Sequence, residues 1–545
     1  MRPGYTPDEE FTVYAVRGIA EHGLPLLPSG LLYDRGILYS YAGWIAHALT
    51  GSELPVYRAL SLAAAAMALW LTYKLMSRIR HPAAGVLAMA LVGTSVPFVA
   101  TATTARFYAP FLALYLAALL MLRRNVAGLA LVVALCRLTH ELAFTLAAIP
   151  VMCWLVDRGR RREWFRAAIA VGVGLIASQL LLFALHAAAP SSGETMVRRF
   201  FVWQVLNLFE RPGDRQFAIP LVVMVVSWLI APRHAWIMTV SSLSVATMIV
   251  AFSIAQASNA APISLALAAN VLSEGSRYPL DMFWHVARTT PLTLAVAVLA
   301  MLQRLHRAPH LEWSPAERAV HGLWVGWLLW FGVIDSGITT NYLLLPVAFM
   351  LMAIAVDAHA MLTSGVAPAR GFTRSRPAVV ALIIGLVAMV IVDQWRATTL
   401  DVARPTIVAD GIADIRNELQ PNDRVACTDE LGCLMLIGRI DRWLALDEFV
   451  RERFVVRRGA DAITGVYTGV PAVFRPVDLL SPNPDFTLPD RVIIVDIFKD
   501  YPIGNSRSWL PMAIERDGLQ VRPLLETPQL RILEISPQER VARFR

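Results

Sequence analysis

The chain has 545 residues, of which 56% are hydrophobic and only 17% are charged. Soluble domains carry about 25% charged residues, so this composition excludes an ordinary soluble protein and indicates a polytopic membrane protein. The net charge is +8, but the arginines are spread over short connections and form no basic low-complexity arm. We therefore expect no nucleic acid partner.

Residues 1–55 form a polar first segment in which acidic residues gather. The stretch "PDEEFTVYAVRGIAEHG" begins with Asp8, Glu9 and Glu10 and continues in a helical pattern. One interpretation is that Asp8 caps this helix by accepting backbone N–H bonds. The other is that the carboxylates perform general-base chemistry at the mouth of a membrane cavity.

Twelve apolar runs are candidates for membrane crossings, because a helix of about 20 apolar residues spans a bilayer. They are 56–77, 83–103, 107–122, 126–137, 142–156, 165–187, 217–231, 235–257, 289–303, 319–334, 342–362 and 377–395. Alternate connections hold the positive charge, among them Arg123, Arg124 and the arginines of 158–166. By the positive-inside rule these connections are cytoplasmic. We therefore predict a transmembrane domain over 56–396, with residues 1–55 and 397–545 on the outer side.

The turn "CRLTHELAF" is expected to lie below the outer membrane surface. The run before it has about a dozen residues, or roughly 18 Å of helix, against a hydrocarbon core of about 30 Å. Arg137, His140 and Glu141 should then face a cavity, because facing lipid costs several kcal/mol. The alternative is that Arg137 and Glu141 pair with each other and only hold the turn.

The outer connections present further arginines and aromatic residues. An arginine fork suits phosphate oxygens, so we expect a phosphate to be held by some of four residues. These are Arg58, Arg106, Arg137 and Arg277. The substrate cavity is expected to be lined by Tyr108, His140, Glu141, Tyr278 and Tyr342. In the alternative interpretation, the arginines bind lipid headgroups and the tyrosines anchor helix ends at the interface.

Residues 397–545 are richer in charge and proline and predict a small α/β domain on the outer side. Four short apolar runs are expected as strands, at 424–428, 442–446, 491–497 and 530–535, with helices at 409–420 and 508–518. A disulfide between Cys427 and Cys433 is possible if this domain is extracytoplasmic, but the sequence does not decide whether they are bridged. The stretch 465–482 is either a substrate-gating loop or a simple connection.

The motifs "PDEEFTVYAVRGIAEHGLP", "TTARFYAPF" and "NYLLLP" resemble those of the GT-C membrane glycosyltransferases. The resemblance is to the branch of protein O-mannosyltransferases and lipid A aminoarabinose transferases. It implies transfer of a sugar from a polyprenyl-phosphate donor to a lipid, protein or polysaccharide acceptor of the cell envelope. The reaction would take place on the outer side of the cytoplasmic (inner) membrane, with inversion. The family's acidic motif falls on Asp8, as the catalytic base, and on Glu9.

The chain departs from these relatives at two positions and leaves other readings open. Relatives commonly place an aspartate where Phe107 follows the arginine, and a basic residue where Asn341 stands. They also carry a helix before the first loop, and one upstream of Met1 would give about thirteen crossings.

A polytopic transporter and a non-catalytic membrane subunit are the alternative functions to a glycosyltransferase. The sequence implies no particular cofactor and leaves open whether a divalent cation assists.

Overall fold

The computed structural model describes the chain in eleven stretches, which fall into two compact units. The described residues are 8–189, 290–306, 314–329, 343–363, 376–401, 411–446, 455–458, 462–481, 489–497, 510–527 and 530–535. One unit, called here the sheet unit, comprises the described residues within Met1–Tyr57, Leu181–Arg199 and Arg404–Arg545. The other, the helical unit, comprises those within Arg58–Leu180 and Phe200–Ala403. Each is described by itself.

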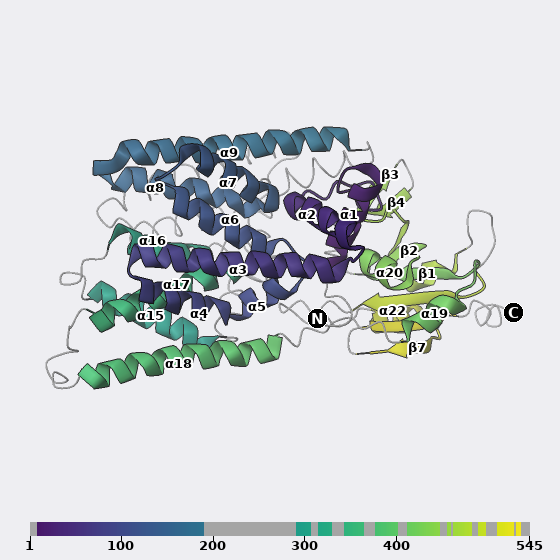
Figure 1. Ribbon diagram of the computed structural model, residues 1–545. Helices are drawn as coiled ribbons and strands as arrows, with labels where there is room; N and C mark the ends of the chain where they lie inside the picture. The colour runs from purple at the N-terminus through teal and green to yellow at the C-terminus, as the bar shows by residue number, and fades with distance from the viewer. Residues whose placement is uncertain are drawn as a thin grey trace, which may run out of the picture. The chain divides into compact units, whose positions relative to one another are not determined.

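The helical unit is built from α-helices and two short 3-10 helices (Figure 1). The first group is α3 (Leu54–Ile79), α4 (Pro82–Gly93), α5 (Val96–Thr103), α6 (Tyr108–Met121), α7 (Val126–Thr139), η1 (Glu141–Ala147), α8 (Ala148–Val156), η2 (Arg158–Arg160) and α9 (Arg161–Ala188). The second group is α15 (Pro291–His306), α16 (Pro315–Leu329), α17 (Leu344–Thr363) and α18 (Arg376–Asp401).

Helix α17 forms the core of the helical unit. It packs against α4, α15 and α16, and its side chains are buried on every side from Leu344 to Asp357. Alanine, leucine and methionine dominate this stretch, so small side chains allow close helix approach and flexible ones fill the gaps. A helix that is apolar all round is typical of a buried position.

Three described helical stretches are long and apolar enough to cross a membrane: Leu54–Ile79, Arg158–Ala188 and Leu344–Thr363. The predicted crossing at 83–103 is a pair of helices, α4 and α5, bent by 66°, which together are long and apolar enough to cross a membrane as one broken span. Ser95 has an extended backbone there and Pro97 lies in the first turn of α5, which ends the regular hydrogen bonding. The predicted crossings at 217–231 and 235–257 lie outside the described residues, and a total of about twelve is not confirmed.

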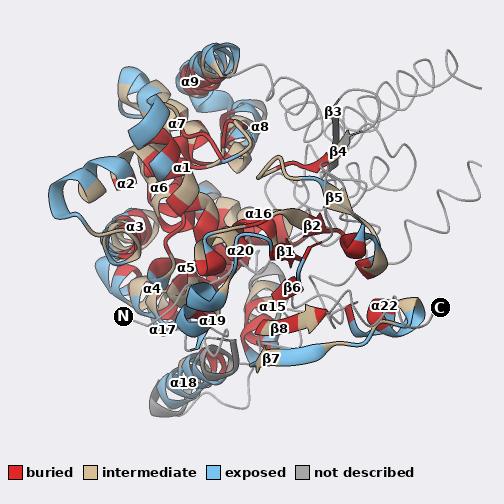
Figure 2. Cartoon of the chain, turned by 90° about the vertical axis from the view of Figure 1, so that its right-hand side faces the viewer, coloured by how far each residue is buried: buried red, intermediate tan, exposed pale blue. Residues whose placement is uncertain are grey.

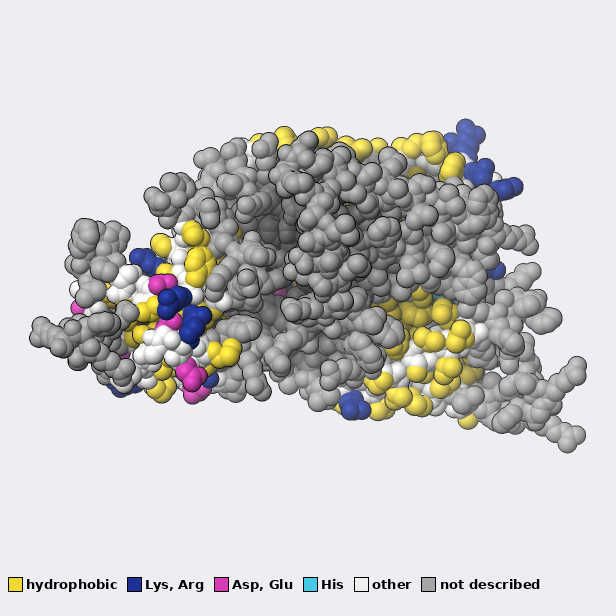
Figure 3. Space-filling view, turned by 180° about the vertical axis from the view of Figure 1, so that it is seen from behind, with side chains coloured by type: hydrophobic (Ala, Val, Ile, Leu, Met, Phe, Trp, Pro, Cys, Tyr) yellow, Lys and Arg dark blue, Asp and Glu magenta, His cyan; other side chains and the backbone are white. Residues whose placement is uncertain are grey.

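The outward face of α9 is apolar along its length and basic at its start. Helix α9 exposes Ile169, Val173 and Ile176. Figure 3 shows hydrophobic side chains along this edge and a group of basic side chains where α9 begins. That group includes the arginines of η2 and of the first turn of α9. This distribution is typical of a membrane helix with a positively charged end.

The sheet unit contains a six-stranded mixed sheet in the order β5-β2-β1-β6-β8-β7. Its strands are β1 (Arg424–Cys427), β2 (Arg442–Leu444), β5 (Ala472–Val473), β6 (Val492–Ile497), β7 (Arg522–Glu526) and β8 (Leu530–Ile535). Strands β5, β2, β1 and β6 pair in parallel, and β8 and β7 continue the sheet antiparallel. A separate hairpin pairs β3 (Val455–Arg458) with β4 (Ala462–Gly465).

Helices cover both faces of this sheet, because the strands alternate two apolar sets of side chains. Val425 and Cys427 of β1 belong to the core that also includes residues of α19 (Ile412–Glu418) and α20 (Glu430–Ile437). Ala426 belongs to the opposite core, with residues of α22 (Leu510–Asp517) and η7 (Pro476–Leu480). Figure 2 shows the central strands buried between these helices. The predicted α/β fold of the C-terminal part is therefore confirmed.

The N-terminal segment contributes two more helices to the sheet unit, α1 (Glu9–His22) and α2 (Ile37–Thr50). Helix α1 packs against both α2 and α20. Gly18 allows a close approach, because a β-carbon there would lie 2.2 Å from the carbonyl oxygen of Leu26. The first and last parts of the chain thus form one compact unit.

Candidate functional site

Asp8, Glu9 and Glu10, called here the acidic segment, lie at the start of α1. The backbone of this segment is unusual. Asp8 has φ 78°, and among the described residues it is the one non-glycine in the left-handed region. It occupies the N-cap position, but its side chain makes no capping hydrogen bond to the helix. Glu9 and Glu10 in the first turn are buried. The capping interpretation of Asp8 therefore lacks its hydrogen bond.

Aromatic side chains hold the first turn of α1. The ring of Phe11 stacks on Tyr33 at 5.5 Å and meets the ring of Tyr467 edge-on at 4.8 Å. Further along α1, the guanidinium of Arg17 forms a two-pronged ion pair with Glu53, with N–O distances of 2.9 and 3.0 Å. These contacts fix the helix that carries the acids.

In the helical unit, the turn that carries Arg106 is bonded to the helix that carries Arg58. Arg58 lies near the start of α3, and Ser61, one turn further on, donates a hydrogen bond to the carbonyl oxygen of Arg106 at 3.1 Å. Arg106 is 5% exposed, and its guanidinium lies 4.8 Å from the ring centre of Phe107 and 5.8 Å from that of Tyr108. A planar guanidinium held against aromatic rings is oriented and partly dehydrated.

His140 joins this group from a second turn of the chain. Its ring lies 5.4 Å from Phe107, 5.8 Å from Tyr108 and 4.9 Å from Phe111. Its Nδ1 accepts the backbone N–H of Leu142 at 3.1 Å, so the neutral ring carries its proton on Nε2. The α5–α6 and α7–η1 turns therefore meet at one end of their helices, and we call these side chains the arginine–aromatic cluster: Arg106, Phe107, Tyr108, Phe111 and His140.

Arg137 and Glu141 lie beside the same turn. Arg137 is 6% exposed, its guanidinium lies over the ring of Phe144 at 4.9 Å, and it donates to the side chain of Gln179 at 3.4 Å. Glu141 begins η1 and is half-buried. A buried arginine at a helix end, held by an amide and an aromatic ring, is suited to bind an anion.

Three of the predicted site residues, Arg277, Tyr278 and Tyr342, lie outside the described residues. Within the described part of the chain, no group of three or more histidines, cysteines, aspartates or glutamates is placed to hold a metal ion.

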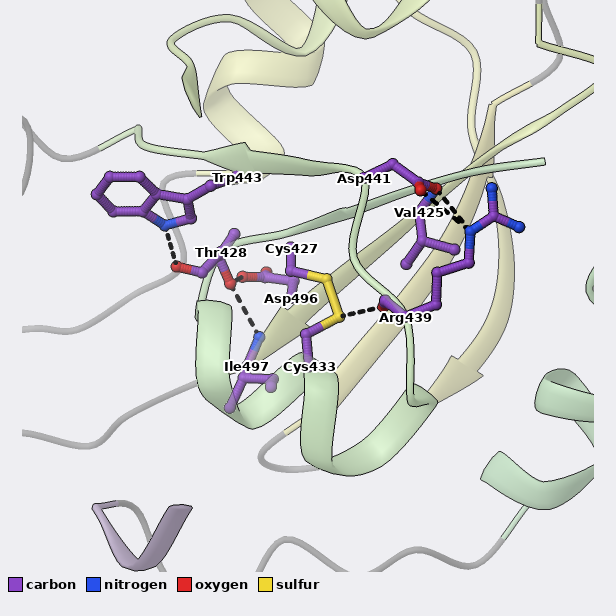
Figure 4. The surroundings of a disulfide bond; sticks show 9 residues. All are labelled: Val425, Cys427, Thr428, Cys433, Arg439, Asp441, Trp443, Asp496 and Ile497. Carbon is purple, nitrogen blue, oxygen red and sulfur yellow. Dashed lines mark hydrogen bonds and ion pairs between the residues drawn. A yellow bond between two sulfur atoms is a disulfide. The ribbon is translucent and has the colours of Figure 1, made fainter. Parts of the chain in front are cut away.

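Cys427 and Cys433 are joined by a disulfide, with a Cα–Cα distance of 6.1 Å (Figure 4). The bond links the end of β1 to the middle of α20. Beside it, Thr428 donates to the carboxylate of Asp496 at 3.0 Å, and the indole N–H of Trp443 bonds the carbonyl of Thr428 at 3.3 Å. The pairing that the sequence left open is thus present in the structure.

Sequence reasoning missed the residues that support the acidic segment. Phe11 and Tyr467 look like ordinary packing aromatic residues in the sequence, and Glu430 resembles any charged residue at a helix start. One signal was available, because the glycines of "GVYTGV" mark a tight turn. This turn contacts Phe11, which lies more than 400 residues earlier in the chain, so no local pattern could predict the contact.

Comparison with known proteins supports the fold class. No protein-family model and no curated protein matches the chain. Solved structures show that its fold is similar to that of GT-C glycosyltransferases. The apo oligosaccharyltransferase of Archaeoglobus fulgidus matches with a TM-score of 0.51 and 12% identity, over 91% of this chain and 66% of that one. ArnT of Cupriavidus metallidurans bound to undecaprenyl phosphate matches with a TM-score of 0.46 and 14% identity, over 98% and 94%. At these identities the likeness concerns the fold alone.

Proposed function

We propose that this chain is a membrane glycosyltransferase that transfers a sugar from a polyprenyl-phosphate donor to an acceptor of the cell envelope. The observation that carries the proposal is the arginine–aromatic cluster, in which Arg106, Tyr108 and His140 come together from two separate turns. A buried guanidinium held against aromatic rings suits a lipid phosphate, and the rings suit the sugar next to it. The GT-C-like fold supports the same kind of reaction.

In this proposal, arginines of the helical unit hold the donor phosphate. Arg58, Arg106 and Arg137 are each buried near helix ends, where charge-assisted hydrogen bonds are strengthened by the lower local dielectric. As the bond from the anomeric carbon to the phosphate oxygen breaks, negative charge grows on that oxygen. Cations placed there stabilise the charge in the transition state.

The acidic segment supplies the base. Asp8 would take the proton from the acceptor hydroxyl or amine while that atom attacks the anomeric carbon, and lipid phosphate leaves on the opposite face. A single displacement inverts the configuration. The left-handed backbone of Asp8 supports this role, because strained positions cluster at active sites. The cytoplasmic membrane, with the sheet unit on its outer side, is the proposed location, since the positive connections favour it.

The test uses purified full-length protein and tritiated undecaprenyl-phosphate-linked hexoses and pentoses as donors. We expect the wild type to release undecaprenyl phosphate and to label an envelope fraction. Asp8→Asn should lower transfer by about 10²–10⁴-fold, the usual contribution of a general base. Glu21→Gln, an exposed acid at the far end of α1, is the matched control and should transfer normally. Unchanged transfer by Asp8→Asn removes Asp8 from the role.

The same assay separates the alternatives. A transporter or a non-catalytic subunit would leave every donor intact under all conditions. No consumption of any donor by the wild type, in the presence of envelope acceptors, would count against a transferase.

A further inference from the structure

Glu430 is a buried carboxylate of the sheet unit that the proposed mechanism does not use. It is 2% exposed and begins α20, between the two cysteines of the disulfide. Its Oε2 accepts the backbone N–H of Thr468 at 2.8 Å and also the hydroxyl of Thr468. Two donors from one residue on one carboxylate oxygen fix the position of Thr468.

Thr468 belongs to a tight turn, called here the 465–470 turn. The N–H of Gly465 donates to the carbonyl of Val470 at 2.8 Å, and the N–H of Gly469 to the carbonyl of Gly465 at 2.9 Å. Gly465 leaves room for the carboxylate, because a β-carbon there would lie 2.3 Å from Oε1 of Glu430. The turn and the carboxylate are therefore fitted to each other.

The tip of this turn contacts the N-terminal segment. The carbonyl oxygen of Tyr467 accepts the N–H of Ser29 at 3.0 Å, and its ring packs edge-on against Phe11. Phe11 lies three residues after Asp8, in the first turn of α1. A continuous series of contacts thus runs from Glu430 through Thr468 and Tyr467 to the acidic segment.

We propose that Glu430 is a positioning residue that holds the 465–470 turn against Phe11 and thereby keeps Asp8 in its left-handed conformation. A non-glycine residue in this conformation is strained, and it persists only where the surroundings hold it. The consequence for catalysis rests on the proposed function, in which Asp8 is the base. A general base displaced by about 1 Å can lose about 10²-fold in rate.

The first test measures conformation and needs no substrate. Amide exchange is followed in purified full-length wild type, Glu430→Ala, Glu430→Gln and Thr468→Val. Asp517→Ala is the matched control, because Asp517 also accepts a backbone N–H, that of Val477 in η7. We expect exchange in residues 8–33 to rise about 10-fold or more in Glu430→Ala and Thr468→Val. Glu430→Gln, which keeps an acceptor oxygen, and Asp517→Ala should exchange there as the wild type does.

Protection of β6 reports whether the sheet is intact. If Glu430→Ala loses that protection, Thr468→Val provides the deciding comparison. Unchanged exchange at 8–33 in a variant with an intact sheet overturns the proposal.

The second test uses whichever undecaprenyl-phosphate-linked sugar the wild type consumes. Glu430→Ala should lower kcat about 10- to 100-fold with an unchanged KM, and Glu430→Gln should restore kcat. Full kcat in Glu430→Ala contradicts the positioning role. If the wild type consumes no donor, the proposed function fails, and the exchange measurement alone decides the contact between Glu430 and the acidic segment.

Discussion

Replacing Glu430 with glutamine removes a buried ionisation but keeps an oxygen that can accept both hydrogen bonds from Thr468. Burial raises the pKa of Glu430 from 4.5 to about 8, and the neighbouring carboxylate of Asp429 adds to this, while the hydrogen bonds from Thr468 and Tyr467 oppose it. Between these two pKa values the folded protein holds a proton that the unfolded chain has lost. Stability should therefore fall as pH rises through this window.

The magnitude follows from the two pKa values. Their difference of about 3.5, at ~1.36 kcal/mol for each pKa unit, corresponds to roughly 5 kcal/mol between pH 4 and pH 8. Glu430→Gln cannot ionise and should lack this dependence. Any loss of stability from packing the glutamine amide against Gly465 is the same at every pH. It therefore cancels, because only the change of stability with pH is compared.

The assay is amide exchange in the peptide that covers β1 and α20, in full-length protein at pH 5, 6.5 and 8. The ratio of the wild-type rate to the Glu430→Gln rate cancels most of the intrinsic pH effect. We expect this ratio to grow by up to about 10³-fold from pH 5 to pH 8. Exchange in α17, which belongs to the other unit, is the control and should give a constant ratio. A constant ratio in β1 and α20 would refute the raised pKa.

Three other substitutions test packing, binding and covalent linkage. Gly174→Ala should loosen α9 from α7 and lower the melting temperature, because a β-carbon there would lie 2.4 Å from the carbonyl oxygen of Ala130. Gly172→Ala in the same helix is the control. A β-carbon at this position meets open space, so the change should be neutral or stabilising by about 1 kcal/mol. Arg106→Lys should raise the KM for the lipid donor about 10-fold, since lysine lacks the planar fork, and an unchanged KM would exclude a phosphate contact. Cys433→Ser should speed amide exchange in α20, and equal exchange would show that the disulfide adds no local stability.

Local pattern predicted the strands that are nearly continuous apolar runs. The strands at 424–428, 491–497 and 530–535 correspond to β1, β6 and β8, because their apolar residues form both faces of a buried sheet. Helix α20 was missed, since "ELGCLMLI" is short and apolar on every side. The antiparallel placement of β8 next to β6 could not be predicted, because strand order depends on contacts distant in sequence.

In the candidate site, too, individual residues could be predicted from the sequence, but the contacts between residues distant in the chain could not. Arg58, Arg106 and Arg137 were proposed because arginines near the outer connections suit phosphate oxygens, and the structure shows that all three are buried. Arg106 and His140 come together because α6 and α7 pack antiparallel. The sequence suggests this grouping only if the α5–α6 and α7–η1 turns are placed on the same side of the membrane. The domain boundaries, the sidedness of the sheet unit and the roles of Asp8 and Glu9 stay predictions.

The enclosure of α17 has a consequence for how this chain can vary. On α9, a residue that faces outward can exchange one apolar side chain for another with little effect, because fluid surroundings adapt to its shape. On α17, neighbours on every side fix the volume of each position, so both shortening and enlarging a side chain such as Phe349 or Met350 should be costly. Among homologous chains, the side-chain volumes of this helix should vary least, even though it carries none of the residues proposed for catalysis or binding.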